Sequence, residues 1–185
     1  MVKTRTSRMK IGIISDTHDD ILNTNKAIDI FSQNNVSIVI HVGDFVAPPV
    51  VTEFKRLSKD GVKIIGVLGN NDGEEQGLKE EFEGINGELF KEIGKIKIDN
   101  LKFGIYHGTD AKKRQKMIDS KKFDVCIFGH THQKENYVDE KTVIVLNPGT
   151  AHYPVKMNYT HDRYFGESTI MIFDTNDKTC LIYDL

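Results

Sequence analysis

The sequence of 185 residues predicts an α/β fold in which two β-sheets pack face to face and helices cover the outside. In the first half of the chain, short β-branched runs alternate with longer amphipathic stretches, which is typical of a βαβαβ unit. In the second half, strand-like runs follow one another, and one amphipathic stretch interrupts them. No internal repeat or Pro/Gly-rich linker divides the chain, so we expect one domain over residues 9–185, preceded by a flexible tail at residues 1–8.

The first half is expected to form three parallel strands joined by helices. In the first predicted helix, Leu22, Ala27 and Phe31 fall near one face, whereas Asn23 and Asp29 can stay in contact with water. Strands that flank such a helix pair in parallel, because the crossover returns the chain in its original direction. We expect strands at residues 10–15, 37–41 and 63–68, helices at 23–34 and 50–58, and a solvated acidic helix face at 74–83.

The second half is rich in β-structure. Turn-forming residues at 99–100, 139–141 and 175–178 predict hairpins between neighbouring strands. The segment 151–166 is long for a connection and rich in tyrosine and histidine, which makes it a candidate substrate-facing loop or partner surface. We expect strands at residues 89–93, 95–98, 101–106, 125–128, 135–138, 142–146, 168–174 and 179–183, and a helix at 111–120.

The composition restricts the class of protein. The hydrophobic content of 38 % and charged content of 28 % are ordinary for a soluble domain, and the formal charge of −2 makes duplex nucleic acid an unlikely partner. No apolar run approaches the roughly 20 residues that a transmembrane helix needs, and no signal peptide is recognisable. Two cysteines, of which Cys126 lies in an apolar run, are too few for a disulfide scaffold. We therefore expect a cytoplasmic protein that does not span a membrane.

Five short polar motifs each stand where a predicted strand ends. Because the carboxyl ends of parallel strands converge on one crevice, side chains delivered from different strands are expected to meet there. The glycines beside the polar residues allow sharp turns and leave room for ions. The motifs are Asp16-Thr17-His18, Gly43-Asp44, Gly69-Asn70-Asn71-Asp72, Tyr106-His107-Gly108 and Gly129-His130-Thr131-His132.

The side-chain types in these motifs predict a metal centre. Imidazole and carboxylate groups suit divalent Mn, Fe, Ni, Co and Zn, whereas a structural zinc site would be rich in thiolates. The spacing of two residues within the first and last motifs predicts an extended backbone that points both side chains to one side. Two ions that share a bridging carboxylate would use every donor and leave positions for water and substrate. The candidate ligands are Asp16, His18, Asp44, Asn70, His107, His130 and His132.

The order of these motifs resembles the calcineurin-like metallophosphoesterases, in particular their small bacterial and archaeal phosphodiesterase branch, over nearly the whole chain. The resemblance implies the four-layer α/β/β/α fold of that family and two divalent ions per chain, with Mn²⁺ favoured over Ni²⁺, Co²⁺, Fe²⁺ or Zn²⁺. It implies that Asp44 bridges the ions. It also implies that one ion is held by Asp16, His18 and His132, and the other by Asn70, His107 and His130.

One departure from the family pattern bears on the substrate. Many phosphatases of the family have a histidine after the third-motif asparagine, where it protonates the leaving oxygen, but this sequence has Asn71. Asparagine can hydrogen-bond a phosphate oxygen, but it cannot deliver a proton near neutral pH. The resemblance therefore implies a small phosphodiester substrate, contacted by Asn71 and attacked by metal-activated water, with no protein acid or base assigned.

Other readings stay open at this point. A similar fold serves as a non-catalytic protein-docking scaffold, and the same chemistry would suit a nucleotide-directed phosphohydrolase or nuclease; a homo-oligomer is also compatible with the sequence. Asp72 is expected to belong to a turn and helix start, and His41 to be a buried residue or one that supports a ligand. His152 and His161 are expected at the surface, with contact to a leaving group as the alternative for either.

Overall fold

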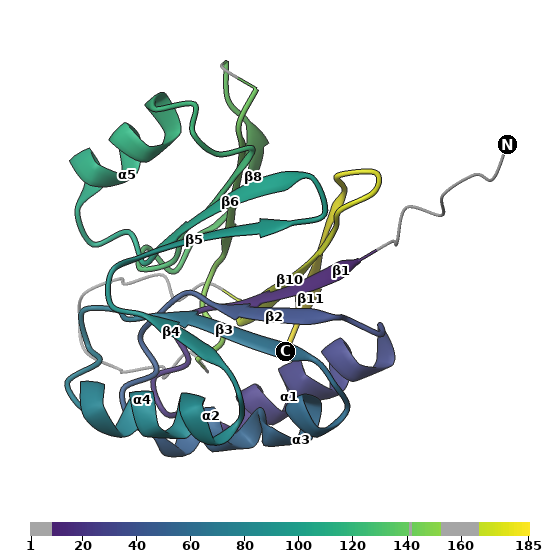
Figure 1. Cartoon of the computed structure of the whole chain (residues 1–185), viewed down its shortest axis with the longest axis vertical. Coiled ribbons are helices and arrows are strands. Elements are labelled where there is room, and N and C mark those ends of the chain that lie inside the picture. The colour runs from purple at the N-terminus through teal and green to yellow at the C-terminus, as the bar shows by residue number, and fades with distance from the viewer. Residues whose placement is uncertain (1–8, 141, 153–166) are drawn as a thin grey trace, which may run out of the picture.

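The computed structural model describes residues 9–140, 142–152 and 167–185, and it confirms the predicted fold class. Two β-sheets pack face to face; helices α1 to α4 cover the outer face of one sheet, and α5 covers the other (Figure 1). The predicted tail at residues 1–8 lies outside the described residues, as does most of the loop predicted at 151–166, including His161.

The first sheet has six strands in the order β11-β10-β1-β2-β3-β4. Strands β1 to β4 pair in parallel, as the βαβαβ pattern predicts, and β10 and β11 extend the sheet in antiparallel. The strands are β1 (Lys10–Ile14), β2 (Ile38–His41), β3 (Lys63–Val67), β4 (Glu88–Phe90), β10 (Thr169–Asp174) and β11 (Cys180–Asp184).

The second sheet has five strands in the order β5-β6-β7-β9-β8. Its three inner strands are parallel, and the edge strands β5 and β8 are antiparallel to their neighbours. Ile98 pairs with Leu101 across the predicted turn at 99–100, so that hairpin is confirmed. The strands are β5 (Ile93–Ile98), β6 (Leu101–Tyr106), β7 (Val125–Ile127), β8 (Lys134–Val138) and β9 (Ile144–Pro148).

Two of the five helices in the described part of the chain begin at an aspartate cap. The Asp20 side chain accepts a hydrogen bond from Asn23 N and starts α1, and Asp110 starts α5 by accepting from Lys112 N and Lys113 N. No helix among the described residues is both long enough and apolar enough to cross a membrane. The helices are α1 (Ile21–Gln33), α2 (Pro49–Glu53), α3 (Lys55–Lys59), α4 (Glu75–Gly84) and α5 (Ala111–Asp119).

Three apolar clusters hold these layers together. One lies between the helices α1 to α4 and the six-stranded sheet, a second between the two sheets, and a third beneath α5. Strand β1 serves two of them, because Ile11 and Ile13 face the other sheet while Ile14 faces the helices. Burial on both faces explains why β1 reads as a continuous apolar run and fixes the position of its carboxyl end.

Two local predictions were wrong. The helix predicted at 50–58 is divided at Phe54, whose N–H bonds to Val51 O in a tighter 3₁₀ turn while its side chain is buried in the first cluster. In α1, Leu22 is 70 % exposed and Asn23 is buried, where its amide donates to Ala151 O. Helical periodicity does not show that α1 packs against Ala151, at the start of the segment 151–166, which we call the late loop. This contact buries Asn23, while Leu22 is left exposed.

Candidate metal centre

The five predicted motifs meet at one edge of the molecule, where the parallel strands of both sheets end. Within the six-stranded sheet, Asp16 N donates to Gly43 O at 3.0 Å, which joins the first two motifs. Across the sheets, His130 N donates to Asp16 Oδ2 at 3.1 Å. Hydrogen bonds from backbone N–H groups therefore hold these loops together, in addition to the packing of the strands.

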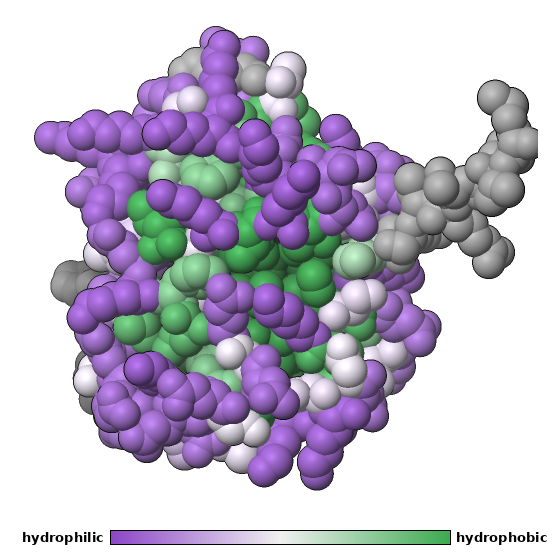
Figure 2. All heavy atoms as spheres, viewed as in Figure 1, coloured by the Kyte–Doolittle hydropathy of each residue, from purple (hydrophilic) through white to green (hydrophobic). Residues whose placement is uncertain are grey.

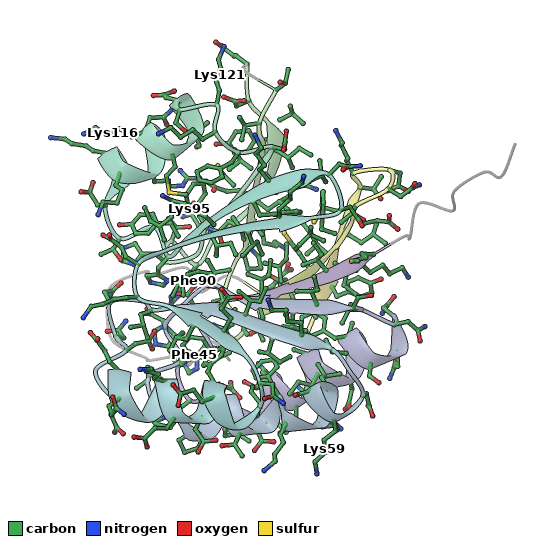
Figure 3. The ribbon with its side chains drawn as sticks, viewed as in Figure 1. Phe45, Lys59, Phe90, Lys95, Lys116 and Lys121 are labelled. Atoms are coloured by element: carbon green, nitrogen blue, oxygen red, sulfur yellow. The ribbon has the colours of Figure 1, made fainter. Side chains whose placement is uncertain are left out.

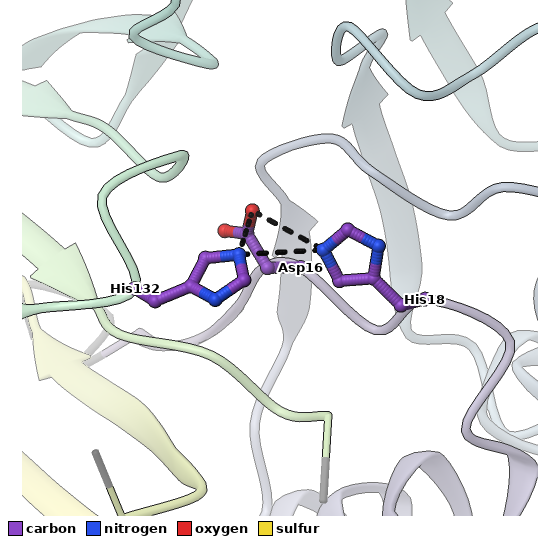
Figure 4. Close-up of side chains that lie close together, drawn as sticks. All are labelled: Asp16, His18 and His132. Atoms are coloured by element: carbon purple, nitrogen blue, oxygen red, sulfur yellow. Dashed lines mark hydrogen bonds and ion pairs between the residues drawn. The ribbon is translucent and has the colours of Figure 1, made fainter. Parts of the chain in front are cut away.

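Asp16, His18 and His132 form the first group of donors (Figure 4). His132 Nε2 lies 3.2 Å from Asp16 Oδ1 and 3.3 Å from His18 Nε2, and His18 Nε2 lies 3.9 Å from Asp16 Oδ1. Donors that are each about 2.1 Å from one ion lie about 3.0–3.4 Å apart in octahedral or tetrahedral geometry. The three side chains can therefore hold one ion after a small movement of His18.

The carboxylate of Asp16 has one satisfied oxygen and one unsatisfied oxygen. Its Oδ2 accepts from Ser15 Oγ and from His130 N. Its Oδ1 is buried and accepts no hydrogen bond from the described part of the chain, although two imidazole nitrogens face it. A buried carboxylate oxygen in this state is unfavourable unless a cation compensates it, so the residues present fit a metal ion.

His107 belongs to the second group. Its Nδ1 lies 2.7 Å from Val42 O, and because a carbonyl oxygen can only accept, Nδ1 carries the proton. The lone pair is then on Nε2, which lies 3.4 Å from Asp44 Oδ2 and 3.2 Å from Asn70 Oδ1. The His130 ring stands 5.2 Å from the His107 ring, centroid to centroid. The Val42 carbonyl thus orients His107 in the way that supporting residues orient metal ligands.

Asp44 lies between the two groups. Its Oδ2 is 3.7 Å from His18 Nε2 and 3.4 Å from His107 Nε2. Asn71 holds the carboxylate in place, because its backbone N–H donates to Oδ1 at 2.9 Å and its side-chain amide donates to Oδ2 at 2.7 Å. Burial opposes ionisation of Asp44, but the neighbouring His107 and the hydrogen bonds from Asn71 outweigh burial and hold its pKa well below the ordinary value.

The histidines of the centre differ in their protonation. The ion pair with Asp16 raises the pKa of His132 above 6.5. Burial opposes the charged form of His107, but Asp44 and Asp16 more than compensate, so the pKa of His107 is also raised. Burial lowers the pKa of His18 despite the two carboxylates nearby. The carboxylates of the centre therefore favour the charged form of His107 and of His132, whereas burial disfavours the charged form of His18.

The backbone at the candidate ligands differs from the predicted extended conformation. Asp16 and His18 have φ of 53° and 43°, and His130 and His132 have φ of 66° and 57°. These are left-handed values, which cost energy for residues with a β-carbon. The prediction of extended pairs was therefore wrong. Asp16 and His18 stay on the same side of the centre, whereas the other pair is divided between its two sides. His132 lies with Asp16 and His18, whereas His130 lies beside His107.

Two glycines make room for the carboxylates. A β-carbon on Gly69 would come within 2.2 Å of Asp44 Oδ1 and 2.4 Å of Asp44 N. A β-carbon on Gly129 would come within 2.1 Å of Ser15 Oγ and 2.9 Å of Asp16 Oδ2. All four distances lie inside van der Waals contact, so the loops can approach the carboxylates only without side chains at these positions.

His41 is buried beneath the centre, as predicted. Its Nδ1 accepts from Gly43 N at 3.2 Å, so its Nε2 carries the proton and donates to Thr17 Oγ1 at 3.1 Å. Its ring stacks on Phe45 at a centroid distance of 3.6 Å. Burial holds the pKa of His41 well below 6.5, and the neutral ring links the first motif to the second.

Asp72 has a larger role than the predicted turn and helix start. It is 6 % exposed; its Oδ2 accepts from Asp44 N at 3.0 Å and Gly69 N at 2.6 Å, and its Oδ1 accepts from Val46 N at 2.8 Å. Burial raises the pKa of Asp72, and the three N–H donors oppose that rise. This carboxylate fastens the loop of Asp44 to the loop of Asn70. In the sequence, the only indication of this role was that Asp72 stands two residues after Asn70, in the same motif.

His152 is half-buried and stands beside the centre, although the sequence predicted a surface position. Its ring lies 5.7 Å from the His18 ring, edge to face. The backbone N–H of His152 donates to Asp16 O, and its backbone carbonyl accepts from Ser168 Oγ. The late loop thus delivers a histidine to the carboxyl end of β1. Sequence spacing gave no signal of this placement, because the contact spans more than 130 residues.

Neither cysteine contributes to the centre. Cys126 is fully buried in the cluster beneath α5, and burial raises its pKa to about 12. The pKa of Cys180 on β11 is also raised to about 12 by burial. The candidate donors are therefore imidazole, carboxylate and amide groups, which suit divalent transition metals.

Residues 9–178 match the family model of the calcineurin-like phosphoesterase superfamily domain. A phosphodiesterase of Methanocaldococcus jannaschii is 46 % identical over 142 residues, which are 76 % of this chain and 83 % of that protein. The solved structure of an archaeal phosphodiesterase, 41 % identical, superposes with a TM-score of 0.82 over 96 % of this chain and 100 % of the other. Vacuolar Protein Sorting 29 from Cryptosporidium parvum, 17 % identical, shares the fold with a TM-score of 0.67 over 96 % and 92 % of the two chains.

Proposed function

The chain belongs to the calcineurin-like phosphoesterase superfamily, and from this premise we propose that it hydrolyses small phosphodiesters at a centre for two divalent metal ions. Its sequence relative and structural neighbour named above are phosphodiesterases, and the chain is a phosphoester hydrolase of that kind. We assign one ion to Asp16, His18 and His132, the other to Asn70, His107 and His130, and the bridge to Asp44. Bound ions of this type would polarise a water and offset the charge that develops on the phosphoryl oxygens.

The observation that carries the proposal is the place of Asp44 between two groups of donors. Its Oδ2 is at nearly the same distance from His18 Nε2, 3.7 Å, as from His107 Nε2, 3.4 Å. The low pKa of Asp44 keeps this oxygen ionised at neutral pH, and Asn71 fixes its direction. A carboxylate held in this way is suited to contact two cations at once.

Asn71 is proposed to contact the substrate as well. It is exposed, and its side-chain amide has two N–H donors, of which one can bind Asp44 Oδ2 while the other binds a phosphoryl oxygen. Since an amide does not release a proton near neutral pH, we propose that the leaving group receives its proton from water. This favours phosphodiesters with good leaving groups over unactivated monoesters.

The identity of the metal is proposed from the donor set. Four imidazoles, two carboxylates and one amide oxygen form a mixed nitrogen and oxygen set, for which Mn²⁺ is our first choice. Ni²⁺, Co²⁺, Fe²⁺ and Zn²⁺ suit the same donors, and metal availability decides among them. Elemental analysis of the protein as purified would identify the native ion.

The experiment that tests the function compares hydrolysis of bis(p-nitrophenyl) phosphate and p-nitrophenyl phosphate. The protein is assayed as purified, after chelation, and after addition of Mn²⁺, and the Asp44→Ala variant is assayed beside an Asp60→Ala control in an exposed position. We expect diesterase activity that chelation removes, Mn²⁺ restores and Asp44→Ala abolishes. Undiminished turnover by the chelated protein or by Asp44→Ala would refute the proposal. A metal-free, inactive protein that binds another protein tightly would favour the scaffold.

A further inference from the structure

A pocket of about 240 Å³ lies between α5 and β5, away from the candidate metal centre. Figure 2 shows hydrophobic side chains at the surface between these two elements, with hydrophilic side chains around them. None of the seven candidate metal ligands lines the pocket. An occupant here would therefore not be a substrate bound at the metal centre, and the inference stands apart from the proposed function.

The floor of the pocket is apolar and well packed. It consists of Ile93, Met117 and Phe123, of which Met117 is 7 % exposed and the other two are half-buried. A β-carbon at Gly104 would come within 2.7 Å of the Phe123 ring, so this ring lies directly on strand β6. Ser120, which lines the wall, donates through Oγ to Met117 O and accepts from Lys122 N. The floor can thus accept an apolar group without rearranging.

The rim of the pocket is cationic. Lys95, Lys113, Lys116 and Lys122 line it, and no acidic residue does. Lys113 pairs with Glu92, whereas the other three lysines form no ion pair with the residues that the structure describes. Figure 3 labels Lys95 on β5 and Lys116 on α5, the two elements that flank the pocket. This positive surface contrasts with the formal charge of −2 for the whole chain.

We propose that this lysine pocket binds a small organic phosphate whose body is a single aromatic ring. The apolar floor would take the ring, and the lysine ammonium groups would bind the phosphate as point charges. The volume supports one ring, because it exceeds the roughly 150 Å³ that holds benzene and is below the roughly 300 Å³ at which sites for larger ligands begin. A dianion matches several lysines better than a monocarboxylate does.

The test uses phenylphosphonate, which has the ring and the dianion but no phosphoester bond to hydrolyse. Binding to the Zn²⁺-loaded protein is measured by calorimetry, and its place is found from the methyl resonances of Met117 and Ile93. We expect saturable shifts of these resonances and affinities about tenfold weaker for methylphosphonate, which lacks the ring, and for benzoate, which has one charge. The same shifts should persist after chelation, since the pocket contains no metal ligand.

Variants decide whether the rim binds the anion. Lys95→Gln combined with Lys116→Gln should weaken phenylphosphonate about tenfold, whereas Lys112→Gln, in an exposed position on α5 outside the pocket, should leave it unchanged. The thermal midpoints of all variants should stay equal, because these lysines are on the surface. Shifts that are absent from Met117 and Ile93, or affinities that are equal for the double variant and the control, would overturn the proposal. Equal affinity for benzoate would overturn the assignment to phosphate.

Discussion

Replacement of Asp72 by alanine is predicted to destabilise the protein and weaken metal binding together. The carboxylate accepts hydrogen bonds from Asp44 N, Val46 N and Gly69 N, and only the first of these donors is fully buried. An unpaired buried donor costs about 1–3 kcal/mol, and water can partly satisfy the other two, so we expect a loss of about 3 kcal/mol in the free energy of unfolding. For a chain of this length, that loss lowers the thermal midpoint by about 6–12 °C.

The Asp72→Asn variant separates geometry from charge. Its amide oxygen can accept the two N–H groups now bound to Oδ2, but its NH₂ group would face Val46 N–H, which is also a donor. We therefore expect a smaller loss of about 1–2 kcal/mol. Thermal unfolding of the metal-free proteins measures the stability, and calorimetric titration with Mn²⁺ measures the metal affinity.

The control for both variants is Asp60→Ala, an exposed carboxylate outside the centre. The thermal midpoints should decrease in the order wild type, Asp72→Asn, Asp72→Ala, and Mn²⁺ affinity should follow the same order. If Asp72→Ala unfolds at the wild-type temperature and binds Mn²⁺ with wild-type affinity, then the carboxylate does not hold the loop of Asp44, and our account of this motif is refuted.

Three further predictions concern the same centre. The raised pKa values of His107 and His132 mean that metal binding competes with protons for both rings, so Mn²⁺ affinity should fall as the pH decreases through neutrality. Calorimetry in buffers of different ionisation enthalpy should detect the released protons. A pH-independent affinity would contradict the prediction. Gly69→Ala, whose new β-carbon would clash with the Asp44 carboxylate, should abolish metal binding, while Gly73→Ala, with no atom within 4 Å, should retain it. Asn71→His should raise the ratio of monoesterase to diesterase activity in the nitrophenyl assay, and an unchanged ratio would count against the missing-acid explanation.

Much of the fold was predictable because both sheets are packed on two faces. Burial of this kind requires largely apolar runs, and β6 was predicted with the bounds that the structure gives, Leu101–Tyr106. The break between α2 and α3 was not predictable, because it depends on the burial of Phe54 against distant residues. The periodicity of α1 placed Leu22 wrongly for the same reason: the neighbours of a helix face come from elsewhere in the chain.

The candidate ligands were predictable because each follows a strand, and the strand order brings the strand ends together. Their backbone conformation was not, since the spacing of Asp16 and His18 fits an extended pair as well as the left-handed turn that the structure contains. The long-range supports were also missed. Asp72 reads locally as a turn residue and His152 as a loop residue, and only the folded chain brings them to Asp44 and His18.

Anomalous diffraction from crystals of the Mn²⁺-loaded protein would test the central claim most directly. We predict two anomalous peaks per chain, about 3.5–4 Å apart, with the Asp44 carboxylate between them. A single peak, or two peaks that do not share Asp44, would contradict the account.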